Sequence, residues 1–394
     1  MSGSGEATSP DPDGGRAPSR GATAGRHTRD TGIDTIRAVA IAGVVGGHWL
    51  VTGLVVHGDG VLRQASPLAA MPQLAPVTWL LQTLGLFFFA GGFAATRALD
   101  RRPAPRTGGG ATDVPDRPPR PRTGRGGTTR LVRAVLMLIG FWAVVLCAGA
   151  ALGTPAGTLR TVAKLVVSPL WFLLPYLALR AVTRPAHRLL GHAGALIAGA
   201  VAVVAASDAG LLPAPLAIAG AWSVPWLLGM LVARDRLRVP PVALIVAGAA
   251  GLAVLIGVAG YPVSAVGVPG DGRSNLSPPS LAAVALAIAQ IGVVLLIRAR
   301  LTRPSRPVAL LNRAALPVYL THQSVLLAVT AAAALLHPRM PGLLSTPDGP
   351  VWVVQRIAWL PVLAAGLLLL VALRRRPGGP VTPRRADPPA LSSA

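Results

Sequence analysis

An arginine and a histidine eleven residues apart form the pair in this sequence best suited to chemistry. Arg37 and His48 lie in the largely apolar stretch IDTIRAVAIAGVVGGHWLVTGLVV. Eleven residues make about three turns of an α-helix, so both side chains are expected on one helix face, about 16 Å apart along the axis. Gly43, Gly46 and Gly47 leave room beside the histidine for a close helix contact or a cavity.

The two residue types suggest a division of labour. A neutral imidazole accepts a proton near pH 7, whereas a guanidinium stays charged and can only bind or stabilise an anion. The pair would suit a transfer reaction in which Arg37 holds an anionic donor and His48 acts deeper in the membrane. His48 could work as a general base or take the transferred group itself. The structural alternative is that His48 hydrogen-bonds a neighbouring helix and Arg37 is an ordinary basic helix flank.

Long charge-free stretches indicate the elements that must position this pair. Only 13% of the 394 residues are charged, whereas a soluble protein carries roughly 25%. A run of about 18 or more such residues spans a bilayer. We therefore predict an all-α, polytopic integral membrane protein of about ten transmembrane helices. Lys164 and Arg356 would have to snorkel to the interface to lengthen two short spans. The charge-free stretches are 37–59, 63–97, 133–160, 164–180, 188–208, 208–234, 238–271, 273–298, 313–339 and 356–374.

The distribution of basic residues gives the orientation. With both termini in the cytoplasm, the inside segments hold 31 of the 37 basic residues, which is a strong positive-inside pattern. This pattern accounts for the net charge of +23 without a nucleic-acid partner. The expected partner is the lipid bilayer, and the expected localisation is the cell membrane, as a multi-pass protein.

Polar, Pro- and Gly-rich segments divide the chain. We predict disordered cytoplasmic tails at 1–32 and 374–394, and a membrane domain over 33–373 that contains a disordered cytoplasmic loop at 101–130. Cys147 is the only cysteine, which excludes an intramolecular disulfide and multi-cysteine metal sites, so no metal is expected. All acidic residues fall at span ends, in loops or in tails, which counts against a proton-coupled carrier.

Several motifs spread from the first to the ninth span resemble one family, the integral-membrane acyltransferases called acyltransferase type three, particularly its actinobacterial members. Members carry an Arg and a His separated by ten residues in the first span, as Arg37 and His48 are. The second-span motif FFxxSGF is matched except at Gly91, where the family usually has Ser. The residues that match this second-span motif are Phe87, Phe88, Gly92 and Phe93. The other matching stretches are PLWFL at 169–173, SNLSPP at 274–279 and LPVYLTH at 316–322.

The resemblance implies a reaction. An acyl group, commonly acetyl or another short acyl group, passes from cytoplasmic acyl-coenzyme A to a hydroxyl or amine of an extracytoplasmic glycan, lipid or small molecule, often a sugar. No cofactor is then bound permanently, because acyl-coenzyme A is a co-substrate. The resemblance makes Arg37 and His48 the catalytic residues. It also includes His322, either in substrate binding or as a buried histidine that supports a neighbouring helix.

Four further residues on the predicted outer side are candidates for acceptor contacts. Arg273 and Asn275, in the Pro- and Gly-rich segment 260–280, could bind a sugar, or could belong to a solvated loop. Arg160 and Lys164 lie one helical turn apart and could bind an anionic acceptor, although snorkelling also explains them.

Two other functional classes remain open at this point. The chain could be a transporter or flippase for a glycan or lipid intermediate, or a non-catalytic component of a cell-envelope complex. A transporter would not consume coenzyme A thioester, and a scaffold would tolerate His48→Ala. The histidine at mid-span and the lack of membrane carboxylates favour an acyltransferase.

Overall fold

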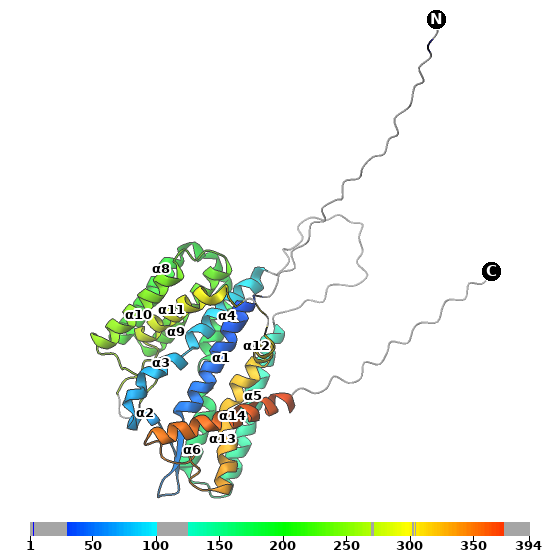
Figure 1. The fold of residues 1–394 in the computed structure, drawn as a ribbon, viewed down its shortest axis with the longest axis vertical. Coiled ribbons are helices and arrows are strands. Elements are labelled where there is room, and N and C mark those ends of the chain that lie inside the picture. The colour runs from blue at the N-terminus through cyan, green and yellow to red at the C-terminus, as the bar shows by residue number, and fades with distance from the viewer. Residues whose placement is uncertain are drawn as a thin grey trace, which may run out of the picture. The chain divides into compact units, whose positions relative to one another are not determined.

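A computed structural model describes residues 30–100, 125–268, 272–301 and 305–373, together with residues 3 and 303. Most of the predicted tail at 1–32, the predicted tail at 374–394 and most of the predicted loop at 101–130 therefore lie outside the described residues, whereas Thr31 and Gly32 of the first tail begin the first helix. The first half contains α1 (Thr31–Val51), β1 (Gly53–Val56), β2 (Leu62–Ala65), α2 (Pro67–Ala70), η1 (Pro72–Val77), α3 (Thr78–Leu81), α4 (Leu84–Asp100), α5 (Arg125–Ala151), α6 (Ala156–Val167), η2 (Ser168–Leu170) and α7 (Leu173–Arg188). The second half contains η3 (Leu190–His192), α8 (Ala193–Asp208), α9 (Ala214–Ala233), α10 (Pro241–Gly257), α11 (Leu281–Arg298), α12 (Arg306–Arg313), α13 (Ala315–Leu336) and α14 (Pro350–Leu373) (Figure 1).

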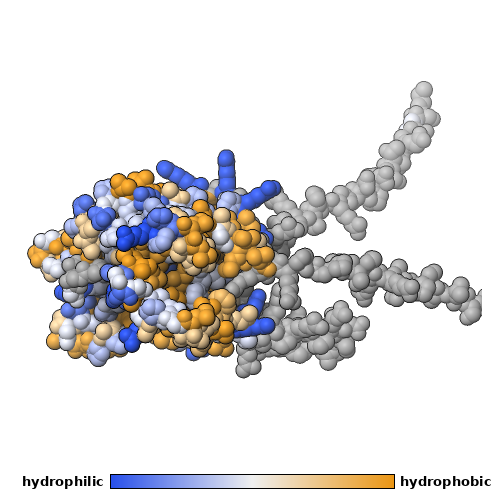
Figure 2. Space-filling view, turned by 90° about the horizontal axis from the view of Figure 1, so that it is seen from below, coloured by the Kyte–Doolittle hydropathy of each residue, from blue (hydrophilic) through white to orange (hydrophobic). Residues whose placement is uncertain are grey.

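The helices confirm the prediction of an all-α, polytopic membrane protein. Among the described residues, eight helical stretches are long and apolar enough to cross a membrane. Large apolar side chains are exposed on them, such as Leu80 (76% exposed), Val144 (70%) and Leu335 (89%), and Figure 2 shows hydrophobic residues over much of the visible surface. Such exposure is expected where lipid replaces water. α10, with 17 residues, and the more polar α1, with 21, fall outside this set, so the count of ten spans stays a prediction.

α1 lies between two groups of helices (Figure 1). On one side it contacts α3, α4 and α11, and on the other side α12, α13 and α14. Its buried residues are divided in the same way, since Ile36 and Ala40 belong to the hydrophobic cluster around α4 and α9, whereas Ile41 and Val45 belong to the cluster around α13 and α14. The helix that carries Arg37 and His48 is therefore held from both sides.

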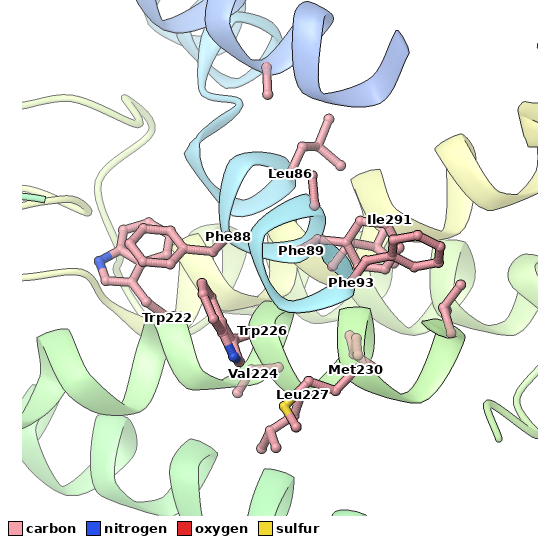
Figure 3. Packing of buried hydrophobic residues seen from close by; sticks show 14 of the residues in the cluster. Leu86, Phe88, Phe89, Phe93, Trp222, Val224, Trp226, Leu227, Met230 and Ile291 are labelled. Atoms are coloured by element: carbon pink, nitrogen blue, oxygen red, sulfur yellow. The ribbon is translucent and has the colours of Figure 1, made fainter. Parts of the chain in front are cut away.

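Close glycine contacts pack α4 against α9, and they explain the FFxxGGF stretch. A Cβ atom at Gly92 would collide with the carbonyl oxygen of Trp226, and one at Gly229 would collide with that of Phe89. Because the backbones meet there, the aromatic residues of α4 reach into α9, and the ring of Phe88 stacks on that of Trp222 at 4.9 Å (Figure 3). Small residues at helix crossings allow such close approach within a membrane.

Two segment boundaries differ from the sequence prediction. Residues 53–59, assigned to the first charge-free stretch, lie beyond the end of α1, in an antiparallel hairpin of β1 and β2. Gly53 ends the helical pattern, Val55 and Val56 favour a strand, and Gly60 adopts φ +74° in the turn. Residues 125–130, assigned to the disordered loop, form the start of α5. The last proline before them is Pro121, so no proline interrupts the helix there.

The prediction that Arg356 snorkels to the interface is wrong. Its side chain is only 1% exposed and donates hydrogen bonds to three carbonyl oxygens: Nε to Trp49 at 2.6 Å, Nη1 to Gly342 at 3.0 Å and Nη2 to Thr52 at 2.5 Å. The last carbonyl groups of a helix lack partners within it and carry its negative dipole end. Arg356 therefore anchors the end of α1 to α14. Lys164 is exposed, as snorkelling requires.

Removing this guanidinium should destabilise the protein. We expect Arg356→Ala to lower the free energy of unfolding by roughly 2–4 kcal/mol, because buried carbonyl groups lose charge-assisted hydrogen bonds. Arg356→Lys should restore only part of this loss, since an ammonium cannot bridge three acceptors with fork geometry. Thermal unfolding of the detergent-solubilised protein measures the effect, with Arg339→Ala, an exposed arginine, as the control. Equal melting temperatures for Arg356→Ala and the parent would contradict the anchoring role.

Candidate functional site

His48 lines a cavity of about 590 Å³ at the end of α1 that is predicted to face outward. The walls come from α1, α3, α9, Trp171 and the stretches 266–267 and 274–279. Among the described residues, the lining contains no Lys, Arg, Asp or Glu. Its polar groups are hydroxyls and an amide, supplied by Thr78, Gln82, Ser168, Ser274, Ser277 and Tyr319. We call this space the outer cavity.

Arg37 lines a second cavity, of about 500 Å³, which we call the inner cavity. Two further cations, Arg180 and Arg184 of α7, share its lining with α4 residues and Tyr176, and no described acidic side chain does. The spacing of Arg180 and Arg184 places them on one face of α7. The inner cavity is therefore suited to an anionic ligand.

An aromatic cluster lies between the two cavities. Phe87 of α4 contacts Tyr176, which lines the inner cavity, at a centroid distance of 5.3 Å, and Tyr319, which lines the outer cavity, at 6.5 Å. Phe172 packs against both Phe87 (5.4 Å) and Tyr319 (4.2 Å). Side chains of the FF and LWFL stretches thus build the partition between the two cavities.

Gly91 lines the inner cavity at this partition. A Cβ at this position would lie 2.7 Å from Cζ3 of Trp226 and 2.8 Å from Cε2 of Tyr176. The serine usual at this position would therefore require both rings to move, and glycine is the residue that fits this arrangement.

Among the described residues, one polar side chain lies within hydrogen-bonding distance of the His48 imidazole, the amide of Gln323. The amide nitrogen lies 3.3 Å from Nδ1 of His48. No hydrogen bond joins Nε2 to a described residue, and the His48 side chain lines the outer cavity. A cavity-lining histidine with one nitrogen held by the protein and the other without a partner has the arrangement of a general base or nucleophile.

His322 lies behind His48 and lines neither cavity. Its ring centroid is 5.2 Å from that of His48, and its side chain is fully buried. Nδ1 lies 2.7 Å from the carbonyl oxygen of Tyr319, while the backbone oxygen of His322 accepts a bond from Nε1 of Trp49 at 3.1 Å. These contacts support the residues next to His48. A direct role in substrate binding stays a prediction.

Asn275 organises the segment that walls the outer cavity. Its side chain is 1% exposed, its amide nitrogen donates to the carbonyl oxygens of Pro262 and Ser264, and its oxygen accepts from Ser280. The neighbouring residues Ser274 and Leu276, rather than Asn275, line the cavity. The described polar atoms of its side chain are thus already used in hydrogen bonds within the loop. A substrate contact by Asn275 is untested and stays a prediction.

Arg273 lies over the ring of Tyr261, with its guanidinium carbon 5.2 Å from the centroid, outside the cavity lining. The hydroxyl of Tyr261 donates to Asp208 at 2.8 Å, and burial together with this carboxylate raises the pKa of Tyr261 to about 12. Arg273 thus packs on the base of the loop, and its predicted role in substrate binding is untested. Arg160 and Lys164 also lie outside the outer cavity.

Several residues at the site were not predicted from the sequence. Gln323 directly follows the histidine of the late motif, and a polar side chain at that depth was a signal. Arg180 and Arg184 were visible as basic residues at four-residue spacing, but the positive-inside pattern already accounted for them. Trp171 was visible within PLWFL, yet nothing in the sequence distinguished a cavity wall from core packing.

A comparison with protein families supports the resemblance that the sequence motifs indicated. A family model described as an acyltransferase domain matches residues 30–375, which includes both cavities and the partition. The match does not separate branches of the family, so the actinobacterial affinity stays a prediction. Neither the curated proteins nor the solved structures contained a significant match.

Cysteine labelling tests whether the two cavities open toward opposite sides. In a Cys147→Ala background, we expect Ser277→Cys, in the outer cavity, to react with a membrane-impermeant maleimide in intact cells. Ala98→Cys, in the inner cavity, should react only after the membrane is permeabilised. The Cys147→Ala background without an added cysteine is the unreactive control, because Cys147 is the only cysteine of the chain. Labelling of both cysteines from the same side would contradict the arrangement.

Proposed function

This chain belongs to the acyltransferase domain family, and from that premise we propose that it transfers a short acyl group, such as acetyl, from cytoplasmic acyl-coenzyme A to a hydroxyl group on the opposite side of the cell membrane. The family match covers most of the chain, so the protein is a membrane acyltransferase. The donor, the acceptor and the direction of transfer are the parts that we propose.

The observation that carries the proposal is the placement of two residues of one helix. α1 supplies Arg37 to the inner cavity and His48 to the outer cavity. A donor held at Arg37 and an acceptor held at His48 would meet through the aromatic partition. A single rigid helix would therefore fix the separation between donor site and reacting group.

Acyl-coenzyme A suits the inner cavity because its phosphate groups are anionic. Arg37, Arg180 and Arg184 offer three guanidinium groups there, and guanidinium groups bind phosphate with paired hydrogen bonds. We infer that the nucleotide end stays at these arginines while the acyl thioester extends toward Phe87. Passage would require Phe87 and its aromatic neighbours to shift.

The proposed transfer is a direct displacement at the thioester carbonyl. The acceptor oxygen attacks the carbonyl carbon while its proton moves to Nε2 of His48. The bond from carbon to sulfur breaks, and the coenzyme A thiolate leaves and takes up one proton. The products are the acyl ester and free coenzyme A. A positioned base contributes typically about 10²–10⁴-fold to such a step.

The lining of the outer cavity favours an uncharged acceptor. No described lining residue could neutralise an anionic group, whereas hydroxyl and amide groups could hydrogen-bond sugar hydroxyls. Trp171 lines the cavity with 39% of its surface exposed and offers an aromatic face to an apolar or sugar surface. A neutral sugar, on a glycan or a lipid, combines these properties.

Acyl transfer by purified protein tests the function, with acetyl-coenzyme A as donor and octyl glucoside as an uncharged acceptor. We expect acetyl ester and an equal amount of free coenzyme A from the parent, and a loss of about 10²-fold or more in His48→Gln. His57→Gln, at an exposed histidine of the hairpin turn, is the matched control and should keep the parent rate.

Two outcomes of this assay would contradict the proposal. If His48→Gln stayed within a few-fold of the parent, His48 would be a packing residue. If the parent bound acetyl-coenzyme A without consuming it under any acceptor tested, including the corresponding octyl glucuronide, the proposed donor chemistry would be wrong.

Donor binding provides a separate test of the inner cavity. Arg37→Ala should weaken acetyl-coenzyme A binding by about 1.5–3 kcal/mol, the usual contribution of a hydrogen bond to a charged group. Arg37→Lys should recover only part of the affinity. Calorimetry measures the change, with Arg160→Ala as the control that removes a positive charge outside both cavities. Unchanged affinity in Arg37→Ala would remove Arg37 from the donor site.

A further inference from the structure

We propose that Gln323 is a positioning residue that holds His48 in the tautomer needed for catalysis. This inference rests on the proposed function, because it concerns the proton that His48 accepts. Gln323 is 2% exposed, lies on α13 and lines neither cavity. Its side-chain amide is the only polar side-chain group of the described residues hydrogen-bonded to the His48 ring.

A neutral imidazole carries one proton, and its position decides what the ring can do. If Nδ1 accepts a hydrogen bond, the proton is on Nε2, and Nε2 cannot act as a base toward the outer cavity. If Nδ1 carries the proton, Nε2 has a free lone pair that faces the acceptor. Catalysis by His48 therefore needs a hydrogen-bond acceptor next to Nδ1.

Gln323 can supply that acceptor by rotating its amide. The amide nitrogen is placed 3.3 Å from Nδ1, while Oε1 is buried without a partner. The oxygen and nitrogen of an amide have nearly the same shape, so their assignment follows from the hydrogen-bond network. In each orientation one of the two amide atoms, the oxygen or the nitrogen, has no described partner. Both orientations therefore make the same number of hydrogen bonds, and this number does not choose between them. Only the orientation with Oε1 toward Nδ1 permits a base at Nε2.

The other groups around His48 cannot take this role. Nδ1 of His322 donates to the carbonyl oxygen of Tyr319, which leaves a lone pair on its Nε2, but this atom makes no hydrogen bond and so does not reach the His48 ring. The hydroxyl of Tyr319 donates to the carbonyl oxygen of Pro169 at 3.0 Å. Arg356 reaches the carbonyl groups of Trp49 and Thr52 and has no acceptor to offer.

Two substitutions separate a positioning role from a packing role. Gln323→Leu keeps similar bulk but removes the acceptor, so it should lower kcat at least about 10-fold and leave KM for acetyl-coenzyme A unchanged. Gln323→Glu keeps an acceptor oxygen and should retain kcat within a few-fold. A residue that only packs within the membrane would give the opposite order, because leucine is tolerated there and a carboxyl group is costly.

The assay is acetyl transfer by the full-length protein, with Thr330→Val as the matched control. Thr330 is another buried, unpartnered polar residue of α13, so this variant shows what the loss of a buried polar group does away from His48. If Gln323→Leu does not fold, as judged by size-exclusion chromatography, Gln323→Met replaces it. Parent-like kcat in the Leu or Met variant would overturn the inference while the parent's own activity upholds the proposed function. An inactive parent would instead overturn the proposed function and this inference with it.

Discussion

The contact between Arg356 and the end of α1 is the constraint on which the outer half of the site depends. α1 ends at Val51, three residues after His48, and the guanidinium of Arg356 binds carbonyl oxygens on both sides of that end. Within a membrane, no water is available to satisfy these groups. Burial of one arginine therefore anchors the end of α1, beyond which Gly53 ends the helical pattern, and with it the depth of His48 and the start of the hairpin that follows.

The same helix relates the two cavities. Arg37 and His48 are positions on one rigid rod, so neither can move along its axis without the other. The surrounding helices mostly differ, with α4 and α7 around the inner cavity and α3, α9 and the loop before α11 around the outer one. Under the proposed function, the donor and acceptor walls can therefore vary separately while the distance between Arg37 and His48 stays constant.

The sequence predicted those features that depend on composition and periodicity. The charge-free stretches correspond to helices, and the eleven-residue spacing placed Arg37 and His48 along one side of α1, although each lies in a cavity of its own. The features that it could not predict depend on partners distant in the chain. Arg356 looked like a boundary residue because two of its three acceptors lie far away in the chain, at separations of 307 and 304 residues. The depth of Gln323 made it notable in the sequence, but its role depends on a contact with His48, 275 positions away.

The aromatic partition explains how one protein could join two aqueous sides without leaking. An open channel between the cavities would let water reach the thioester and would let ions pass. Phe87, Phe172 and the two tyrosines separate the cavities with rings that pack at 4.2–6.5 Å, and the two phenylalanine rings can rotate without breaking hydrogen bonds. Under the proposed function, a neutral acyl group on its thioester could displace such rings, whereas a hydrated ion would lose its solvation in doing so. The partition would then admit the acyl end of the donor and leave its charged end at the arginines of the inner cavity.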